Sequence, residues 1–124
     1  MDIIISNVDG TPIYEQIVRQ IKGLIVSDGL KSGEALPSMR LLAKELRISV
    51  ITTKRAYEEL ERDGFITTQT GRGSFVAPRN AELMREEVLR TVEGHLTRAV
   101  EAAHMGALCK DEFLDMAATL FEEE

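Results

Sequence analysis

The chain has 124 residues, enough for one domain and a short appendage, and its apolar content of 44% allows a hydrophobic core. It has no run of 18 apolar residues and its acidic start lacks a basic region, which argues against a membrane-spanning helix and a secretory signal. One cysteine and two distant histidines favour neither a disulfide nor a metal site. We therefore expect a soluble, cytoplasmic protein with no metal and no cofactor.

The net charge of −6 is unevenly distributed along the chain. Residues 1–78 carry ten basic and ten acidic residues, whereas residues 79–124 carry five basic and eleven acidic ones. Residues 40–55 hold five bases and a single acid, Glu45. Because a phosphate backbone responds to the local field, the acidic total does not exclude nucleic-acid binding.

The first half of the chain predicts a short apolar segment and three helices. Residues 2–9 are apolar and partly β-branched, which indicates an edge strand or an arm. Apolar residues at helical spacing predict a helix over 12–28, with Thr11 as its N-cap and Pro12 as its first residue. After a loop over 29–37, Ser38 and Ser49 can cap helices over 38–46 and 50–62. The side chains expected to face inward are Leu41, Leu42 and Leu46 in the second helix, and Thr53, Ala56, Tyr57 and Leu60 in the third.

The hydrophobic period then changes from helical to β. Residues 65–68 and 74–76 are β-rich, and the turn residues between them predict a hairpin whose Phe75 faces the core. Pro78 ends the hairpin, and the junction at 78–80 is the candidate boundary between two regions, 1–78 and 79–124. Two more helices are expected, over about 79–104 and about 110–123, with Cys109 where a serine would be a better N-cap.

The helix expected over 79–104 carries a narrow apolar seam of coiled-coil type. The short helix expected over 110–123 can cover only part of this seam, and the uncovered part would be an exposed apolar patch. Two copies of the chain would cover it, so we expect a homodimer. The residues assigned to the dimer interface are Leu89, Val92, Leu96, Ala99, Ala103, Phe113, Met116 and Leu120.

Two short helices joined by a turn over 47–49 are typical of a helix-turn-helix, and the following hairpin would make it winged. The expected fold class is therefore mostly α with a small β-hairpin (α+β), a winged helix-turn-helix domain followed by a two-helix region. In such a domain the start of the second helix of the pair meets base edges, while the first helix crosses the DNA backbone. Hydroxyls and cations at that start can bond phosphates or bases, and Ile51 can meet a thymine methyl.

The run 36-LPSMRLLAKELRISVITTKRAYEELERDGFITTQTGRGSFVA-77 resembles the DNA-binding domain of the GntR family of bacterial regulators. The stretch 12-PIYEQIVRQIKGLI-25 is similar to the family's first helix, and the short tail resembles the YtrA subfamily, whose members are dimers. The resemblance implies a transcription regulator, a repressor, that binds an inverted-repeat operator in double-stranded DNA. The expected DNA-binding residues are Arg40, Ser49, Val50, Ile51, Thr52, Lys54 and Arg55, with Gly71, Arg72 and Gly73 at the wing tip.

Three positions qualify this expectation. Arg47 stands where the family often has glycine, which costs about 1 kcal/mol if the residue is left-handed. Val50 stands where many members have a polar residue, so base readout there is expected to be weaker or apolar. Arg55 has Glu58 and Glu59 three and four residues later, and an ion pair with either would compete with DNA contact.

One alternative function stays open, a winged-helix module for protein–protein contact that docks through its acidic tail and binds no specific DNA. An enzyme fits poorly, because the Gly-Arg-Gly lacks the spacing of a phosphate-binding loop and no catalytic set of residues is present. The sequence identifies neither the operator nor a small-molecule effector. A pocket for an effector between the tail helices and the winged domain is left open.

Overall fold

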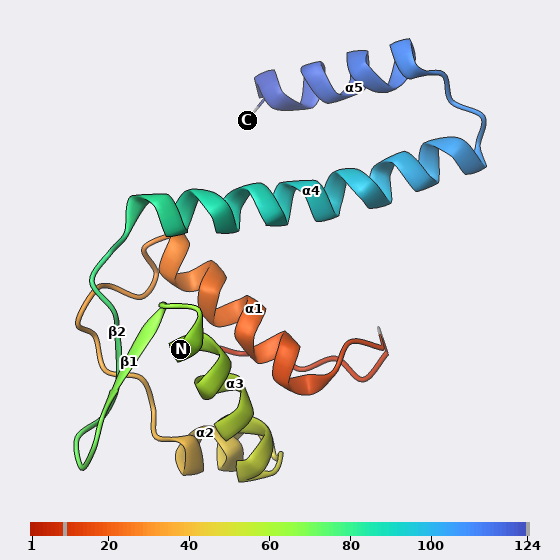
Figure 1. The fold of residues 1–124 in the computed structure, drawn as a ribbon. Helices are drawn as coiled ribbons and strands as arrows, with labels where there is room; N and C mark the ends of the chain where they lie inside the picture. The colour runs from red at the N-terminus through yellow and green to blue at the C-terminus, as the bar shows by residue number, and fades with distance from the viewer. Residues whose placement is uncertain (9, 124) are drawn as a thin grey trace. The chain divides into compact units, whose positions relative to one another are not determined.

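The computed structural model describes residues 1–8 and 10–123, so Asp9 and Glu124, the last residues of two predicted segments, lie outside it. The elements in chain order are α1 (Ile13–Val26), α2 (Met39–Leu46), α3 (Val50–Arg62), β1 (Ile66–Gln69), β2 (Gly73–Val76), α4 (Ala81–Met105) and α5 (Lys110–Glu123) (Figure 1). The expected mixture of helices and one hairpin is confirmed. Within the described residues, no helix is both long and apolar enough to cross a membrane.

The chain divides into two compact units, Met1–Glu87 and Val88–Glu124. The division therefore falls after Glu87, later than the boundary expected after residue 78. The physical reason is that the first turns of α4 belong to the core of the first unit. Met84 is buried there and Leu83 packs against the same cluster.

The core of the first unit is formed by α1, α2, α3 and the hairpin. In α1, Ile17, Ile21 and Ile25 are spaced four residues apart and are all buried, which makes one apolar stripe. The other fully buried side chains of large volume are Tyr57, Leu42, Leu60, Ile66 and Thr53. The inward positions predicted for α3 are therefore confirmed.

Leu41 is a correction to the predicted core. Its side chain is 47% exposed, whereas the neighbouring Leu42 is 1% exposed. Successive residues point about 100° apart around a helix, and the eight-residue α2 buries only the stripe that includes Leu42 and Ala43. Leu41 lies outside that stripe.

Ser38 and Ser49 cap α2 and α3 as predicted, whereas α1 departs from the predicted cap. Ser38 accepts a hydrogen bond from the Leu41 N–H at 3.1 Å, and Ser49 accepts one from the Thr52 N–H at 3.1 Å. Each serine satisfies a backbone donor that the first turn of its helix leaves without an intrahelical partner. The exception is α1, where Pro12 flanks the helix and Ile13 is its first residue, one position later than predicted.

The hairpin is antiparallel, with Ile66 opposite Val76 and Gln69 opposite Gly73. The segment 33–36, expected to be loop, pairs with the other edge of β2. The Val76 N–H donates to the Glu34 carbonyl and the Leu36 N–H donates to the Ser74 carbonyl, both at 2.9 Å. Phe75 is only half-buried, contrary to expectation, because alternate residues of a strand face opposite sides and Val76 occupies the core side.

Residues 1–8 form an arm held along α1 by two glutamine side chains. The Gln20 side chain exchanges hydrogen bonds of 2.9 and 2.7 Å with the backbone N–H and carbonyl of Ile4. Gln16 does the same with Ser6, at 2.8 and 2.7 Å. Each primary amide therefore takes the place of a neighbouring strand, and Ile3 is buried against the core. Of the two predicted alternatives, the arm is the observed one.

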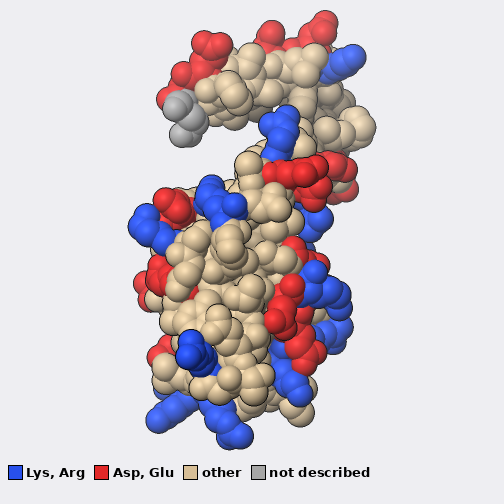
Figure 2. Space-filling view, turned by 60° about the vertical axis from the view of Figure 1, so that its left-hand side comes forward, with Lys and Arg blue, Asp and Glu red and all other residues tan. Residues whose placement is uncertain are grey.

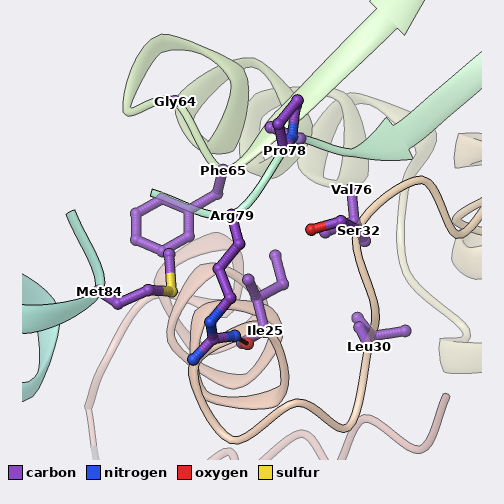
Figure 3. A pocket seen from close by; sticks show the side chains of 10 residues that line it. Ile25, Leu30, Ser32, Gly64, Phe65, Val76, Pro78, Arg79 and Met84 are labelled. Atoms are coloured by element: carbon purple, nitrogen blue, oxygen red, sulfur yellow. Dashed lines mark hydrogen bonds between the residues drawn. The ribbon is translucent and has the colours of Figure 1, made fainter. Parts of the chain in front are cut away.

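The junction between β2 and α4 is tied to the end of α1 (Figure 3). The Arg79 guanidinium donates to the carbonyls of Ile25 and Val26 at 2.9 and 3.0 Å, where a helix C-terminus presents acceptors and partial negative charge. Figure 3 shows the Met84 sulfur beside the Phe65 ring. The cavity that these residues help to line measures about 10 Å³, room for about one water.

The second unit consists of the rest of α4 and of α5. Within 88–123 every residue is exposed or half-buried, so these helices have no buried core of their own. The turn before α5 contains Ala107 at φ 55°, a left-handed conformation. The Cys109 thiol, which precedes α5, donates to a Glu112 carboxylate oxygen at 3.2 Å.

Candidate nucleic-acid interface

The two helices of the helix-turn-helix are held together by buried polar contacts. The Thr53 hydroxyl lies 3.1 Å from the Met39 carbonyl at the start of α2 and 2.8 Å from the Val50 carbonyl in its own helix. The Tyr57 hydroxyl donates to the Pro37 carbonyl at 2.7 Å, and burial raises the pKa of this phenol well above its ordinary value. These contacts set the position of the first turn of α3 relative to α2.

The turn between the helices requires a left-handed residue. Arg47 caps α2 with φ 57° and ψ 48°, the conformation in which glycine carries no steric penalty. The conditional expectation about Arg47 is thereby met, and the residue is strained by about 1 kcal/mol. Its side chain is exposed.

The structure brings most of the predicted helix-turn-helix residues to one exposed surface at the start of α2 and α3. Figure 2 shows Lys and Arg side chains gathered at the end of the first unit that α2 and the start of α3 form in Figure 1. Of the predicted residues, Arg40, Ser49, Val50, Ile51, Lys54 and Arg55 are exposed and Thr52 is half-buried.

Several of these polar side chains are already engaged within the chain. The Ser49 and Thr52 hydroxyls lie 2.8 Å apart, in addition to the cap that Ser49 forms. Lys54 Nζ lies 3.9 Å from a Glu58 carboxylate oxygen, with both side chains more than half exposed, so this pair contributes little energy and is readily given up.

Arg55 has a different partner from the ones that the sequence suggested. Its guanidinium carbon lies 3.8 Å from the centroid of the Tyr14 ring, a cation–π contact across to α1. The acids named as alternatives pair elsewhere, Glu58 with Lys54 and Glu59 with Arg62. Sequence spacing alone could not identify Tyr14, which lies 41 residues away in the chain.

The wing tip is formed as the turn residues predict. The Arg72 N–H donates to the Gln69 carbonyl at 2.9 Å, and Gly71 and Gly73 have φ of 79° and 108°. A Cβ at either glycine would meet no atom within 4 Å, so the backbone conformation and not crowding is what requires glycine. Arg72 is exposed at the tip.

A buried cation that the sequence did not single out lies behind the helix-turn-helix. Lys22 Nζ is 2.9 Å from Asp63 Oδ2 and 3.9 Å from Glu87 Oε2, and it lies over the Phe65 ring at 5.0 Å from the centroid. Its side chain is only 6% exposed. The contact ties α1 to the end of α3 and to α4. The sequence signal was a lysine on the apolar side of a helix, four residues after Val18 and three before Ile25.

The residues assigned to a dimer interface are apolar and solvent-accessible in the single chain. Leu89, Val92 and Leu96 are 53%, 47% and 47% exposed, and Met116 and Leu120 are 53% and 57% exposed. Ala99 is exposed, while Ala103 and Phe113 are half-buried. The second unit thus presents an apolar surface on α4 and α5.

Comparison with known proteins places this geometry in a family. Residues 13–76, which span α1 to the end of β2, match the family described as "Bacterial regulatory proteins, gntR family". The chain is 37% identical over 94 residues to the HTH-type transcriptional repressor YtrA of Bacillus subtilis (strain 168), which covers 76% of this chain and 72% of YtrA. It is 35% identical over 117 residues to the uncharacterized HTH-type transcriptional regulator YhcF of the same organism. The match covers 90% of this chain and 91% of YhcF.

A solved structure extends the similarity to the fold. A GntR family transcriptional regulator from Listeria monocytogenes superposes with a TM-score of 0.74 at 26% identity, covering 90% of this chain and 96% of the other. These relatives are regulators and not enzymes, which removes the enzyme alternative. The chain belongs to the gntR family of bacterial transcription regulators and carries that family's helix-turn-helix DNA-binding domain.

Proposed function

We propose that the chain is a cytoplasmic repressor that binds an inverted-repeat operator as a homodimer. The observation that carries the proposal is the exposed basic surface at the start of α2 and α3, held rigid from behind by the Thr53 and Tyr57 hydrogen bonds. The name of the relative YtrA, a transcriptional repressor, supports the direction of control. The proposal names no small-molecule effector.

In this proposal α3 enters the major groove. Ser49, Thr52 and Lys54 contact phosphates and base edges there, and Arg55 adds a cation beside them. Arg40, in the first turn of α2, contacts the backbone. Arg72 at the wing tip reaches the adjacent minor groove or its phosphates, where the flanking Gly71 and Gly73 let the backbone come close.

The homodimer is proposed on the apolar surface of the second unit. Leu89, Val92 and Leu96 follow one another at helical spacing and remain about half exposed in the single chain. A twofold pair of chains would cover these side chains and would match the twofold symmetry of an inverted repeat.

The test is DNA binding by charge-deleting variants. A duplex is first selected from a random pool with the wild-type protein, and its affinity is then measured by mobility shift as salt is raised. We expect Arg40→Ala, Lys54→Ala and Arg72→Ala each to weaken binding about tenfold, the value of one charge-assisted hydrogen bond. Each should also lower the slope of log affinity against log salt by about 1.

The matched control is Arg98→Ala, an exposed arginine of α4 outside the winged domain, which should bind like wild type. If the three variants also bind like wild type, the contacts are wrongly assigned. If the wild-type protein selects no sequence at all, the regulator proposal fails for this chain. That result would favour the alternative of a winged-helix module for protein–protein contact.

A further inference from the structure

The first turn of α3 carries two exposed apolar side chains on an otherwise charged surface. Ile51 is 80% exposed and Val50 is 40% exposed. Burying such side chains against an apolar partner is favourable, so this position can accept an apolar complement. The residues from 40 to 55 around them include five bases and one acid, which favours a polyanion over an acidic or neutral protein surface.

The polar neighbours of these two side chains are engaged within the chain. Ser49 caps the helix and shares a hydrogen bond with Thr52, and Arg55 is stacked on Tyr14. These contacts constrain the direction of each polar group, while its remaining donors and acceptors stay accessible. The side chains of Val50 and Ile51 are exposed in the same turn, so they can meet a base edge directly.

An apolar side chain in the major groove has one complement among the base edges, the C5 methyl group of thymine. We propose that Ile51, with Val50 beside it, identifies thymine in each half-site of the operator through that methyl group. This inference rests on the proposed function, because it requires the start of α3 to lie in the major groove. It assigns to two aliphatic side chains the base discrimination that hydroxyls and cations usually provide.

A protein partner fits this surface less well. Two side chains make a patch far below the area that a stable protein interface buries, about 800 Å² on each partner. The larger set of exposed apolar side chains lies instead on α4 and α5. The start of α3 is therefore assigned to DNA and not to a further protein contact.

The experiment removes only the methyl group from the DNA. In the duplex selected by the wild-type protein, each thymine is replaced in turn by deoxyuridine, which keeps the base pair and lacks the C5 methyl. We expect affinity to fall about fourfold at one or two positions in each half-site, the value of one buried methyl group. Replacing the symmetric thymines in both half-sites should multiply the two losses to about fifteenfold.

Two variants connect that loss to the side chains. Ile51→Ala should bind the thymine duplex more weakly than wild type and should bind the thymine and deoxyuridine duplexes equally at the sensitive position. Val50→Ala should reduce the ratio of the affinity for the thymine duplex to the affinity for the deoxyuridine duplex, at the same or the adjacent position. The matched control is Ile4→Ala, an isoleucine 77% exposed on the N-terminal arm, which should keep the wild-type ratio.

The outcomes separate this inference from the proposed function. If wild-type protein binds every deoxyuridine duplex as tightly as the thymine duplex, or if both alanine variants keep the wild-type ratio, methyl readout is wrong. Specific binding that still depends on Arg40 and Arg72 would then leave the regulator proposal intact. If no duplex is selected, both proposals are overturned.

Discussion

The guanidinium of Arg55 lies over the ring of Tyr14, 3.8 Å from its centroid, and so joins α3, the helix proposed to face DNA, to α1. The contact fixes the direction of a cation that the helix surface alone would leave mobile. Arg55 is exposed and Tyr14 is half-buried at the edge of the core. The pair is thus a bridge between the core and the proposed DNA surface.

The first prediction concerns this pair. A double-mutant cycle with Tyr14→Leu and Arg55→Gln should give a coupling free energy of about 0.5–1 kcal/mol in urea unfolding, the value of an exposed cation–π contact. Tyr14→Phe should retain the coupling because the ring remains. Arg62→Gln, on the same helix but paired with Glu59, should show no coupling with Tyr14→Leu. Equal coupling in both cycles would contradict the assignment.

The second prediction concerns Lys22, whose ammonium group lies between two carboxylates. Lys22→Met keeps the packing of the stem but leaves Asp63 and Glu87 without their cation, and we expect a loss of about 2–3 kcal/mol in the free energy of unfolding. The loss is put below that of a fully buried pair because the Asp63 side chain is 36% exposed.

The controls for Lys22 use its partners and an exposed lysine. Lys44→Met, at an exposed position, should change stability by less than about 0.5 kcal/mol. Adding Asp63→Asn and Glu87→Gln to Lys22→Met should restore part of the lost stability, because the carboxylates no longer repel one another. Wild-type stability of Lys22→Met in urea would show that the ion contacts contribute nothing.

The third prediction is a pH dependence at Tyr57. Burial raises the pKa of its phenol in the folded chain above the unfolded value of about 10. Below pH 10 both states hold the proton and the stabilisation is complete. Above pH 10 the unfolded state loses its proton first, so stability falls by up to about 1.4 kcal/mol per pH unit as pH rises toward the folded pKa.

Tyr57→Phe separates the effect of this phenol from that of other side chains that lose a proton at high pH. At pH 7.5 the variant should be less stable than wild type by about 1 kcal/mol, because the hydrogen bond to the Pro37 carbonyl is lost. At pH 11 the difference should shrink or reverse, since phenylalanine does not ionise. Urea unfolding at the two pH values measures it, and a difference that does not change with pH would refute the explanation.

The fourth prediction concerns the left-handed cap of α2. Arg47→Gly should raise the free energy of unfolding by about 1 kcal/mol, because glycine adopts φ 57° without steric penalty. Lys44→Gly, in the right-handed last turn of the same helix, should lower it by about 1 kcal/mol. Thermal and urea unfolding of the two variants would have to move in opposite directions.

The fifth prediction tests the proposed dimer. Leu96→Glu should weaken self-association at least about a hundredfold, because a charge would be buried in the seam without a partner. Thr97→Glu adds the same charge about 100° around the helix and should leave association unchanged. Sedimentation equilibrium distinguishes the two. Identical behaviour of both variants would show that the seam is not the interface.

The local elements of this protein were accessible to prediction because their signals are short-range. Ser38 and Ser49 cap the helices expected of them, and the glycines at 71 and 73 have the positive φ of the predicted turn. These features depend on a residue and its neighbours within a turn. Leu41 was wrongly placed in the core because its helix is too short for the apolar pattern to distinguish adjacent leucines.

Contacts between distant segments could not be predicted in the same way. The residues that contact Lys22 and Arg55 lie far from them in the sequence. The loop residues 33–36 are likewise distant in the sequence from β2, with which they pair. Which partner each side chain finds depends on how the helices pack. No single-chain periodicity carries that information.

The sequence by itself therefore determined the winged helix-turn-helix, its caps, its wing tip and its family, because all of these are written in local spacing and residue type. Only the tertiary structure decided which side chains at the start of α3 remain available at the proposed DNA surface. Packing against α1 engages Arg55, while Ile51 is left 80% exposed. The reason is that availability is set by the neighbours a side chain has in space, and folding alone supplies those neighbours.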